Sequence, residues 1–496
     1  MAERVVVIGA GIAGLALALA LKKSDCELVL VERDPPPPKI PPESAFDEWQ
    51  RPGVPQFRHA HILLARLQTL LRDQHPEVLA DLLAAGLTLS RVEELLPPSH
   101  RDHYASQPGD AELFHLWGRR ATFEYVLRDH VGRLPNVRLV HSARVTGLRS
   151  QSSDGTVRVT GVELVRGGVE ETLDADVVVD ASGKRTRSNE WLEKLGVKIE
   201  RDENPSRFVY ACRHFRLNDA SASPPRLDGG GNLDFLGYAT FYAEHGTFAL
   251  TFGCPVDEKE LAAAMHRPEG FEALCRQLPV LERWIDAAEP TTKVLGAGLF
   301  ENRWTRYGAA GGNKLLGFFA CGDSYVETNP MYGRGCSAAF MEAHVLASVL
   351  MSVTDPDARA RRYYETAGAM LKPYYDLSIA TDRMYHMRAR MSRGAPLTLG
   401  ERVLNWGYEA AWMPAVESNL VVAREMVKSA QMREMSSAAT RLAVVLQLVL
   451  ALLRTLFGGQ RAPDAVTPRR IELLHRLPAH QDDGVSAEAV RASADQ

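Results

Sequence analysis

The 496-residue chain lacks the features that mark several large classes of protein. It has only six cysteines, with no C-x-x-C pair and no spacing typical of a metal site. We therefore expect free thiols in a reducing cytoplasm and no bound metal. The formal net charge of −4 gives no excess of positive charge that would indicate nucleic acid as a partner. The first predicted strand begins almost at once, so no signal peptide is expected. These absences together predict a cytoplasmic protein.

A long uninterrupted apolar run is also absent. The most hydrophobic segment, residues 441–457, is interrupted by Gln447 and Arg454. A helix that spans a bilayer needs about 20 predominantly apolar residues, and this segment is shorter. We expect a buried helix here, and a helix lying on a membrane surface is the alternative.

The strongest motif that is present lies within residues 5–32. An apolar strand is followed by a glycine-rich turn, an alanine- and leucine-rich helix, a second strand and an acid. Gly9, Gly11 and Gly14 give the G-x-G-x-x-G spacing, which lets the backbone and a helix N-terminus approach a pyrophosphate. Glu32 stands about 20 residues further on, where a carboxylate binds the adenosine ribose. The context predicts a dinucleotide site.

A second motif lies at residues 322–335. Gly322 and Asp323 follow an apolar strand, and a glycine-rich loop then leads into a long helix. An aspartate at the end of a buried strand can accept a hydrogen bond from a ribityl or ribose hydroxyl. The free N–H groups of the loop and the positive end of the helix suit a reduced flavin, whose N1–C2=O edge carries negative charge.

These segments resemble FAD-dependent monooxygenases of the p-hydroxybenzoate hydroxylase fold. The resemblance is carried by GVPQFRHAHILLA, WGRRATFEYVLR, VVVDASGKRTRSNEWL and CGDSYVETNPMYGRGCSAA, which are most similar to the flavin epoxidases of polyether biosynthesis. Flavin halogenases and geranylgeranyl reductases are related families on the same scaffold.

The resemblance implies roles for particular residues. Glu32 would hold the AMP ribose, Arg120 the ribityl and phosphate region, and Val145 the adenine through its backbone. Asp323 would hold the ribityl and pyrophosphate region. The full set of expected cofactor-binding residues is Gly9, Gly11, Ile12, Ala13, Gly14, Glu32, Arg33, Arg58, Arg120, Val145, Asp323, Gly333, Arg334 and Gly335. The loop expected to face the isoalloxazine is Asn329, Pro330, Met331, Tyr332 and Gly333. No catalytic residue is assigned.

The expected fold class is α/β, with a Rossmann-like FAD-binding domain, an inserted antiparallel β-sheet domain for the substrate, and a helical C-terminal region. Period-two alternation of aromatic and β-branched residues between about 200 and 300 predicts the inserted sheet. The expected boundaries are 1–200 for the first part of the FAD-binding domain, with a partly helical insertion at 40–110, then 201–300 for the sheet, 301–370 for the return segment, 371–480 for the helical region and 481–496 for a disordered tail.

Two departures from the related families narrow the expected chemistry. The D-G pair that serves flavin and NADPH in the aromatic hydroxylases is replaced by Asp180-Ala181-Ser182-Gly183, as in the epoxidase and halogenase branch. The W-x-W-x-I-P signature of halogenases is absent, which argues against halogenation. We expect a separate flavin reductase rather than NAD(P)H to deliver the electrons. A basic NADPH groove at Lys184, Arg185 and Arg187 is the alternative, and a solvated loop is the favoured interpretation of that cluster.

The expected function is an FAD-dependent monooxygenase with non-covalent FAD and O₂. A flavin hydroperoxide would transfer one oxygen to a hydrophobic organic substrate, by epoxidation or hydroxylation in secondary metabolism. Two alternatives stay open at this stage. One is an FAD-dependent reductase of prenyl double bonds, and the other is a non-catalytic carrier of a hydrophobic ligand on the same fold.

Overall fold

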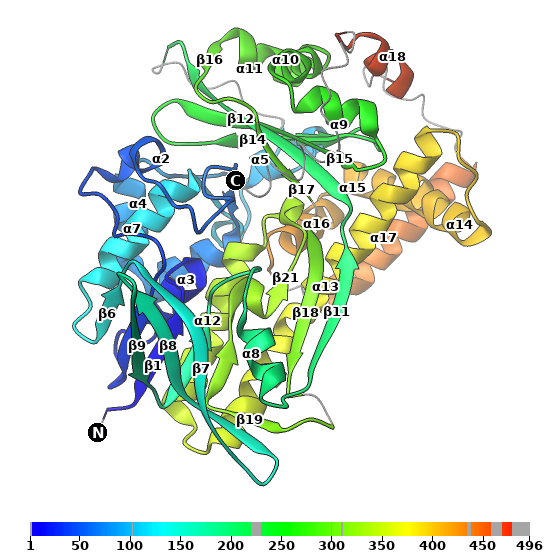
Figure 1. The fold of residues 1–496 in the computed structure, drawn as a ribbon. Helices are drawn as coiled ribbons and strands as arrows, with labels where there is room; N and C mark the ends of the chain where they lie inside the picture. The colour runs from blue at the N-terminus through cyan, green and yellow to red at the C-terminus, as the bar shows by residue number, and fades with distance from the viewer. Residues whose placement is uncertain are drawn as a thin grey trace.

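The computed structural model describes residues 2–101, 103–219, 230–298, 300–308, 311–433, 438–457 and 469–478. The expected disordered tail at 481–496 lies outside this set. The described residues form a first lobe built on a parallel sheet, a second lobe built on an antiparallel sheet, and a group of C-terminal helices (Figure 1).

A five-stranded parallel sheet forms the centre of the first lobe. Its strand order is β20-β10-β1-β2-β6, with bounds Phe318–Ala320, Val177–Asp180, Arg4–Ile8, Glu27–Val31 and Val137–Val140. The central strands are continuous apolar runs and fully buried, as expected for parallel strands covered on both faces. Helices α1 (Ile12–Ala20), α7 (Arg120–Gly132) and α12 (Gly335–Ser352) pack against the sheet and each other.

Two smaller sheets extend this lobe. The first consists of β7 (Ala143–Ser153), β8 (Thr156–Arg166), β9 (Val169–Asp174) and β19 (Lys314–Leu316). The second consists of β11 (Ile199–Pro205), β18 (Glu301–Tyr307) and β21 (Val326–Glu327). Since β11 leaves the first lobe and β18 returns to it, their antiparallel pairing marks where the second lobe is inserted.

The second lobe is built on an antiparallel sheet. Its strands are β12 (Phe208–Leu217), β13 (Gly230–Asn232), β14 (Gly237–Tyr242), β15 (Thr247–Pro255), β16 (Ala288–Pro290) and β17 (Leu295–Gly298). Helices α9 (Lys259–Met265), α10 (Pro268–Arg276) and α11 (Pro279–Asp286) pack on it around a core that includes Phe252, Phe271 and Trp284. The predicted fold class is confirmed.

Short elements fill the segment between β2 and α7. They are η1 (Pro42–Ser44), α2 (Ala45–Glu48), β3 (Ile62–Leu63), α3 (Ala65–Gln74), α4 (Pro76–Ala84), β4 (Thr88–Leu89), α5 (Val92–Leu95), α6 (Pro98–Arg101), η2 (Asp110–Glu112) and β5 (Leu116–Trp117). The turns α8 (Ser188–Lys194), η3 (Gly322–Ser324) and η4 (Pro330–Tyr332) lie near the cavity described below.

The C-terminal region is helical, as expected. It contains α13 (Pro356–Ser392), α14 (Leu399–Gly407), the π-helical turn η5 (Tyr408–Trp412), α15 (Met413–Ser418), α16 (Leu420–Ala430), α17 (Ala438–Phe457) and α18 (Arg470–His475).

The expectation that residues 441–457 form a buried helix is wrong. By length and composition alone, Gly335–Ser352 and Thr440–Phe457 are both apolar enough to cross a membrane. The first is 61% buried and belongs to the core, whereas the second is only 11% buried. Apolar composition predicted burial, but the described elements cover only one side of α17.

Candidate active site

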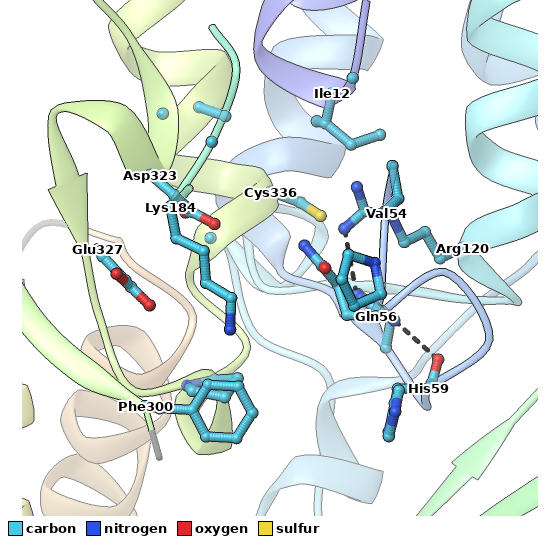
Figure 2. A pocket seen from close by; sticks show the side chains of 18 of the residues that line it. Ile12, Val54, Gln56, His59, Arg120, Lys184, Phe300, Asp323, Glu327 and Cys336 are labelled. Atoms are coloured by element: carbon cyan, nitrogen blue, oxygen red, sulfur yellow. Dashed lines mark hydrogen bonds between the residues drawn. The ribbon is translucent and has the colours of Figure 1, made fainter. Parts of the chain in front are cut away.

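A cavity of about 720 Å³ lies between the two lobes (Figure 2). Turns at the carboxyl ends of the parallel strands form one wall, and the antiparallel sheet forms the other. The expected site residues that line it are Gly9, Gly11, Ile12, Ala13, Glu32, Arg33, Arg120, Val145, Asp323, Pro330, Met331, Gly333 and Gly335. Segments far apart in the sequence therefore meet at one cavity, as the two motifs predicted.

The glycine-rich turn before α1 has a backbone that only glycine fits. Gly9 adopts a φ of +98°, and a Cβ there would lie 2.7 Å from the carbonyl oxygen of Ala181. A Cβ on Gly14 would lie 2.2 Å from the carbonyl oxygen of Gly9, so this glycine lets helix and turn pack closely. A Cβ on Gly11 would meet no described atom within 4 Å, and no described side chain caps the α1 N-terminus. The first N–H groups of α1 are thus open to a ligand phosphate.

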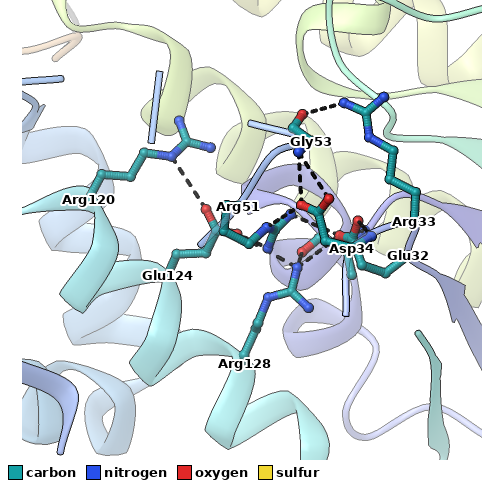
Figure 3. A network of polar contacts seen from close by, with 9 residues as sticks. Glu32, Arg33, Asp34, Arg51, Gly53, Arg120, Glu124 and Arg128 are labelled. Atoms are coloured by element: carbon teal, nitrogen blue, oxygen red, sulfur yellow. Dashed lines mark hydrogen bonds and ion pairs between the residues drawn. The ribbon is translucent and has the colours of Figure 1, made fainter. Parts of the chain in front are cut away.

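Glu32 lines the cavity and is fixed by an ionic network (Figure 3). Its Oε2 accepts hydrogen bonds from Arg51 and Arg128, both at 2.9 Å, and from the Ala10 N–H at 3.2 Å. Burial opposes ionisation, but the two guanidinium groups outweigh it and hold the pKa of Glu32 below its ordinary value. Arg51 also pairs with Asp34 and Glu124. The carboxylate is therefore held charged and in one orientation.

Arg120 and Asp323 both line the cavity, and the charge of Arg120 acts on Asp323. Arg120 begins α7 and reaches Glu124 Oε2 and His61 Nε2, each at 3.4 Å. Asp323 accepts no hydrogen bond through its carboxyl group from the described residues. Burial raises the pKa of Asp323, and the nearby positive charges, with Arg120 first among them, oppose this rise. Its carboxyl group is free to accept a hydrogen bond from a ligand hydroxyl.

The loop before α12 forms another part of the cavity wall. Gly333 has a φ of +64°, and a Cβ there would lie 2.3 Å from Ile62 Cγ2. Helix α12 then begins at Gly335, and no described side chain caps its N-terminus. The free N–H groups and the positive end of the helix dipole therefore face the cavity. They could stabilise negative charge on a ligand bound there.

Some expected site residues do not reach the cavity. Asn329 and Tyr332 point behind the loop, where both donate to Asp382 Oδ1, at 2.8 and 2.6 Å. Arg334 is buried and donates to the Tyr374 carbonyl at 3.0 Å. Arg58 turns to the backbone of the α2 helix and donates to the Phe46 carbonyl at 3.1 Å. Gly14 lies beneath the turn. These residues shape the walls rather than face a ligand.

Other cavity residues were not among the expected ones. Arg51 and Glu327 follow no recognisable pattern in the sequence. Lys184, Arg185 and Arg187 were expected to lie in a solvated loop, with an NADPH groove as the alternative. Arg185 and Arg187 are exposed, and all three residues border the cavity. The Lys184 Nζ lies 4.8 Å from the centre of the Phe300 ring. Their position after β10, at the carboxyl edge of the parallel sheet, is the signal that could have placed them.

Burial shifts Glu327, His59 and His61, which line the cavity, toward their uncharged forms. Burial and, to a smaller extent, the negative charge of Asp323 raise the pKa of Glu327 to about 7. They outweigh the opposing charge of Arg303, whose Nη2 lies 3.0 Å from Glu327 Oε2. Burial also lowers the pKa of His59 to about 4 and of His61 to about 3. Both histidines are therefore neutral at physiological pH and can accept as well as donate a hydrogen bond.

The wall formed by the second lobe is apolar and nearly free of charge. Its aromatic members are Tyr210, Tyr238 and Phe241, and its strands also carry Gly237, Gly253, Gly296 and Gly298. Phe300, just after β17, and Tyr385 of α13 complete the aromatic lining. The hydroxyl of Tyr210 donates to Asn329 Oδ1 at 2.7 Å. A hydrophobic ligand fits this half of the cavity, because few polar groups would lose water there.

The fold and the cavity define the class of structure. Residues 7–37 match the family described as "NAD(P)-binding Rossmann-like domain". Similar solved structures include the flavin-dependent brominase Bmp2, with a TM-score of 0.58 and 15% identity over 90% of this chain and 99% of that one. Another is p-nitrophenol 4-monooxygenase PnpA from Pseudomonas putida DLL-E4, with a TM-score of 0.59 and 16% identity over 88% and 99%. The chain has the fold of FAD-dependent monooxygenases and halogenases.

Two known sequences match this chain at higher identity. Protein Rv3254 of Mycobacterium tuberculosis (strain ATCC 25618 / H37Rv) is 29% identical over 378 residues, 70% of this chain and 73% of its own length. The 3-(3-hydroxy-phenyl)propionate/3-hydroxycinnamic acid hydroxylase 2 of Burkholderia vietnamiensis (strain G4 / LMG 22486) is 28% identical over 215 residues. That match covers 41% of this chain and only 33% of the hydroxylase.

Proposed function

We propose that the protein is an FAD-dependent monooxygenase that transfers one oxygen atom from O₂ to a hydrophobic organic substrate. The observation that carries the proposal is one cavity with two different halves. One half has two uncapped helix N-termini beside glycine turns, and the other is a wall of aromatic side chains and glycines. The similarity to a hydroxylase sequence and to monooxygenase structures supports the same class.

The residues present fit FAD. The N-terminus of α1 and Arg120 would hold the phosphates, and Glu32 would hold the adenosine ribose. Asp323, whose carboxyl group has no described hydrogen-bond donor, would accept a ribityl hydroxyl. The turn from Gly333 to Gly335 would border the ring system. Bound FAD would supply the activation of O₂, which no side chain can provide.

The contribution of the chain itself is orientation, charge and exclusion of water. The N-terminus of α12 would stabilise negative charge on the bound ring. The aromatic wall, with Tyr210 fixed by Asn329, would hold the substrate in a dry region. The neutral His59 and His61 add no charge there. Since oxygen transfer at such a site needs no obligatory acid or base from the protein, we assign no catalytic residue.

Finer features of the proposal come from the sequence resemblance. Similarity to polyether-type epoxidases favours epoxidation or hydroxylation of an apolar metabolite. The missing D-G pair favours electrons from a separate flavin reductase. Lys184, Arg185 and Arg187 line the cavity and are the residues through which NADPH would act directly if the reductase were not needed.

The experiment begins with the cofactor. The purified protein should release FAD on heating, identified by its mass. After anaerobic reduction, admission of O₂ should produce a transient absorbance that differs from the oxidised and reduced spectra. Direct reoxidation with no transient would contradict a monooxygenase, and a protein that takes up no flavin after reconstitution would be a carrier. Rapid bleaching by NADPH without a reductase would contradict the proposed electron source.

A further inference from the structure

The outward face of α17 is apolar from Leu442 to Phe457. Its exposed side chains are Leu442, Val445, Leu446, Val449, Leu453, Leu456 and Phe457. The steps between them are three, one, three, four, three and one residues, which keeps them on one face of an α-helix. Leu442 is 71% exposed and Phe457 is 84% exposed. We call these seven residues the α17 stripe.

The opposite face attaches α17 to the rest of the protein. Val444 and Ala451 are buried in a small core with residues of α15 and α16, including Val416 and Val422. The Thr455 hydroxyl donates to the Ala410 carbonyl of η5 at 2.8 Å. The helix therefore lies along the surface of the protein, and the α17 stripe faces outward as part of the folded molecule.

The charged residues of α17 itself have one sign. Arg441 and Arg454 are both exposed. At about 100° per residue, Arg441 falls at one edge of the stripe and Arg454 at the other. Residues 438–457 contain no aspartate or glutamate. An apolar face with arginines along both edges is the arrangement in which the stripe enters a lipid surface while the guanidinium groups stay among anionic headgroups.

A second exposed apolar group lies on the neighbouring helix. In α14, Leu399, Val403, Leu404 and Trp406 are exposed, and α14 leads directly into η5, which packs against α17. Figure 1 shows both helices at the side of the molecule away from the parallel sheet. Tryptophan is enriched where protein meets the headgroup region of a membrane.

Two other occupants of the stripe are less compatible with these residues. The segments 458–468 and 479–496 contain no leucine, isoleucine, methionine or aromatic residue, so their composition does not suit them to cover it. A second copy related by a two-fold axis would place the same patch on both sides. Arginine edges would then meet with no acid on α17 to pair with them.

We propose that α17 docks the protein onto an anionic lipid surface, with the helix lying in the plane of the interface. The inference is independent of the proposed function, because it uses no residue of the cavity. It does account for how a hydrophobic substrate dissolved in a membrane could reach the enzyme.

The test uses the full-length protein with large unilamellar vesicles, made of phosphatidylcholine alone or mixed with phosphatidylglycerol. We expect co-sedimentation with the anionic vesicles, weaker binding to the neutral ones, and a decrease as salt is raised. The double variant Leu446→Gln/Leu453→Gln should lower the partition coefficient about 10-fold or more, because two apolar side chains no longer leave water. Both positions are exposed, so the fold should be unaffected.

A matched control replaces two exposed apolar residues elsewhere, Val169→Gln and Met351→Gln, and should leave vesicle binding unchanged. A second variant, Arg441→Gln/Arg454→Gln, should reduce the preference for anionic over neutral vesicles. Absence of binding to both vesicle types would overturn the proposal, as would equal binding by the leucine variant and the parent. A concentration-dependent dimer in solution that the leucine variant abolishes would assign the stripe to a second copy instead.

Discussion

Two helices of this protein have almost the same length and apolar character but opposite surroundings. Helix α12 has 18 residues and α17 has 20. The most apolar window of α12 is 61% buried, whereas that of α17 is 11% buried. Composition alone does not distinguish them. What differs is how the neighbouring elements are placed, since α12 lies against α1, α3 and α13, whereas η5, α15 and α16 cover α17 on one side only.

The burial of α12 serves the site at its N-terminus. Glu342, fully buried on α12, accepts a hydrogen bond from the Gly322 N–H at 2.6 Å. Burial raises the pKa of Glu342 well above its ordinary value. This contact ties the turn that carries Asp323 to the same helix whose first residues border the cavity. The packing of α12 in the core therefore also fixes the position of its N-terminus at the cavity. The α17 stripe, in contrast, is exposed and can contact a surface outside the protein.

The largest expected difference between the two helices concerns stability. Phe340 of α12 is fully buried, so Phe340→Ala should lower the free energy of unfolding by about 3–5 kcal/mol, through lost burial and the cavity left behind. Urea denaturation followed by circular dichroism measures this change. A loss below about 1 kcal/mol would show that α12 is not part of the core.

The next largest effect is expected for FAD binding at the cavity, which the N-terminus of α12 borders and α17 does not. Arg120→Ala should remove a charge-assisted contact of about 1.5–3 kcal/mol, which raises the FAD dissociation constant roughly 10- to 150-fold. Titration of the apo-protein with FAD measures it. The matched control is Arg58→Ala, since Arg58 turns away from the cavity toward the Phe46 carbonyl. Equal losses in both variants would contradict the assigned role of Arg120.

Acid should act on buried parts of the molecule rather than on α17, because residues 438–457 hold no histidine. Burial lowers the pKa of five histidines to about 3 or 4, namely His59, His61, His75, His115 and His214. Unfolding returns each towards its ordinary pKa of 6.5, so the unfolded state binds more protons below that pH. Their contribution to stability is complete above pH 6.5 and is lost as the pH falls towards 4.

The size of this effect can be measured on one histidine. For His115→Gln, the free energy of unfolding should depend less steeply on pH between 4 and 6.5, by at most about 1.4 kcal/mol per pH unit. His115 is fully buried next to Ser90. The exposed His245 provides the control, and His245→Gln should keep the parental slope. An unchanged slope in His115→Gln would mean that this histidine is protonated in the folded protein.

The sequence predicted those parts of the fold that depend on local pattern. The βαβ unit with Gly9, Gly11 and Gly14, the buried run at β10, and the alternating strands of the second lobe follow from short-range periodicity. The two motifs predicted which turns meet at the cavity. Arg51 could not be predicted, because its partners Glu32, Asp34 and Glu124 come together only through tertiary packing. Arg334 and Arg58 were misplaced for the same reason, since the direction of a long side chain depends on distant carbonyl groups.

The smallest expected effect concerns α17 and completes the comparison. Leu446 is 55% exposed and therefore loses little water-excluded surface when truncated, so Leu446→Ala should change the free energy of unfolding by at most about 0.5 kcal/mol. Alanine also keeps helix propensity high, which removes a competing cause of destabilisation. The same urea experiment as for Phe340→Ala measures it, so that one buried and one exposed apolar side chain are compared under the same conditions. A loss of about 2 kcal/mol or more in dilute solution would show that the stripe is covered in the isolated protein. With phosphatidylglycerol vesicles present, the free energy of unfolding should rise more for the parent than for Leu446→Ala. The reason is that lipid bound to the α17 stripe stabilises the folded protein, and the variant binds lipid less well.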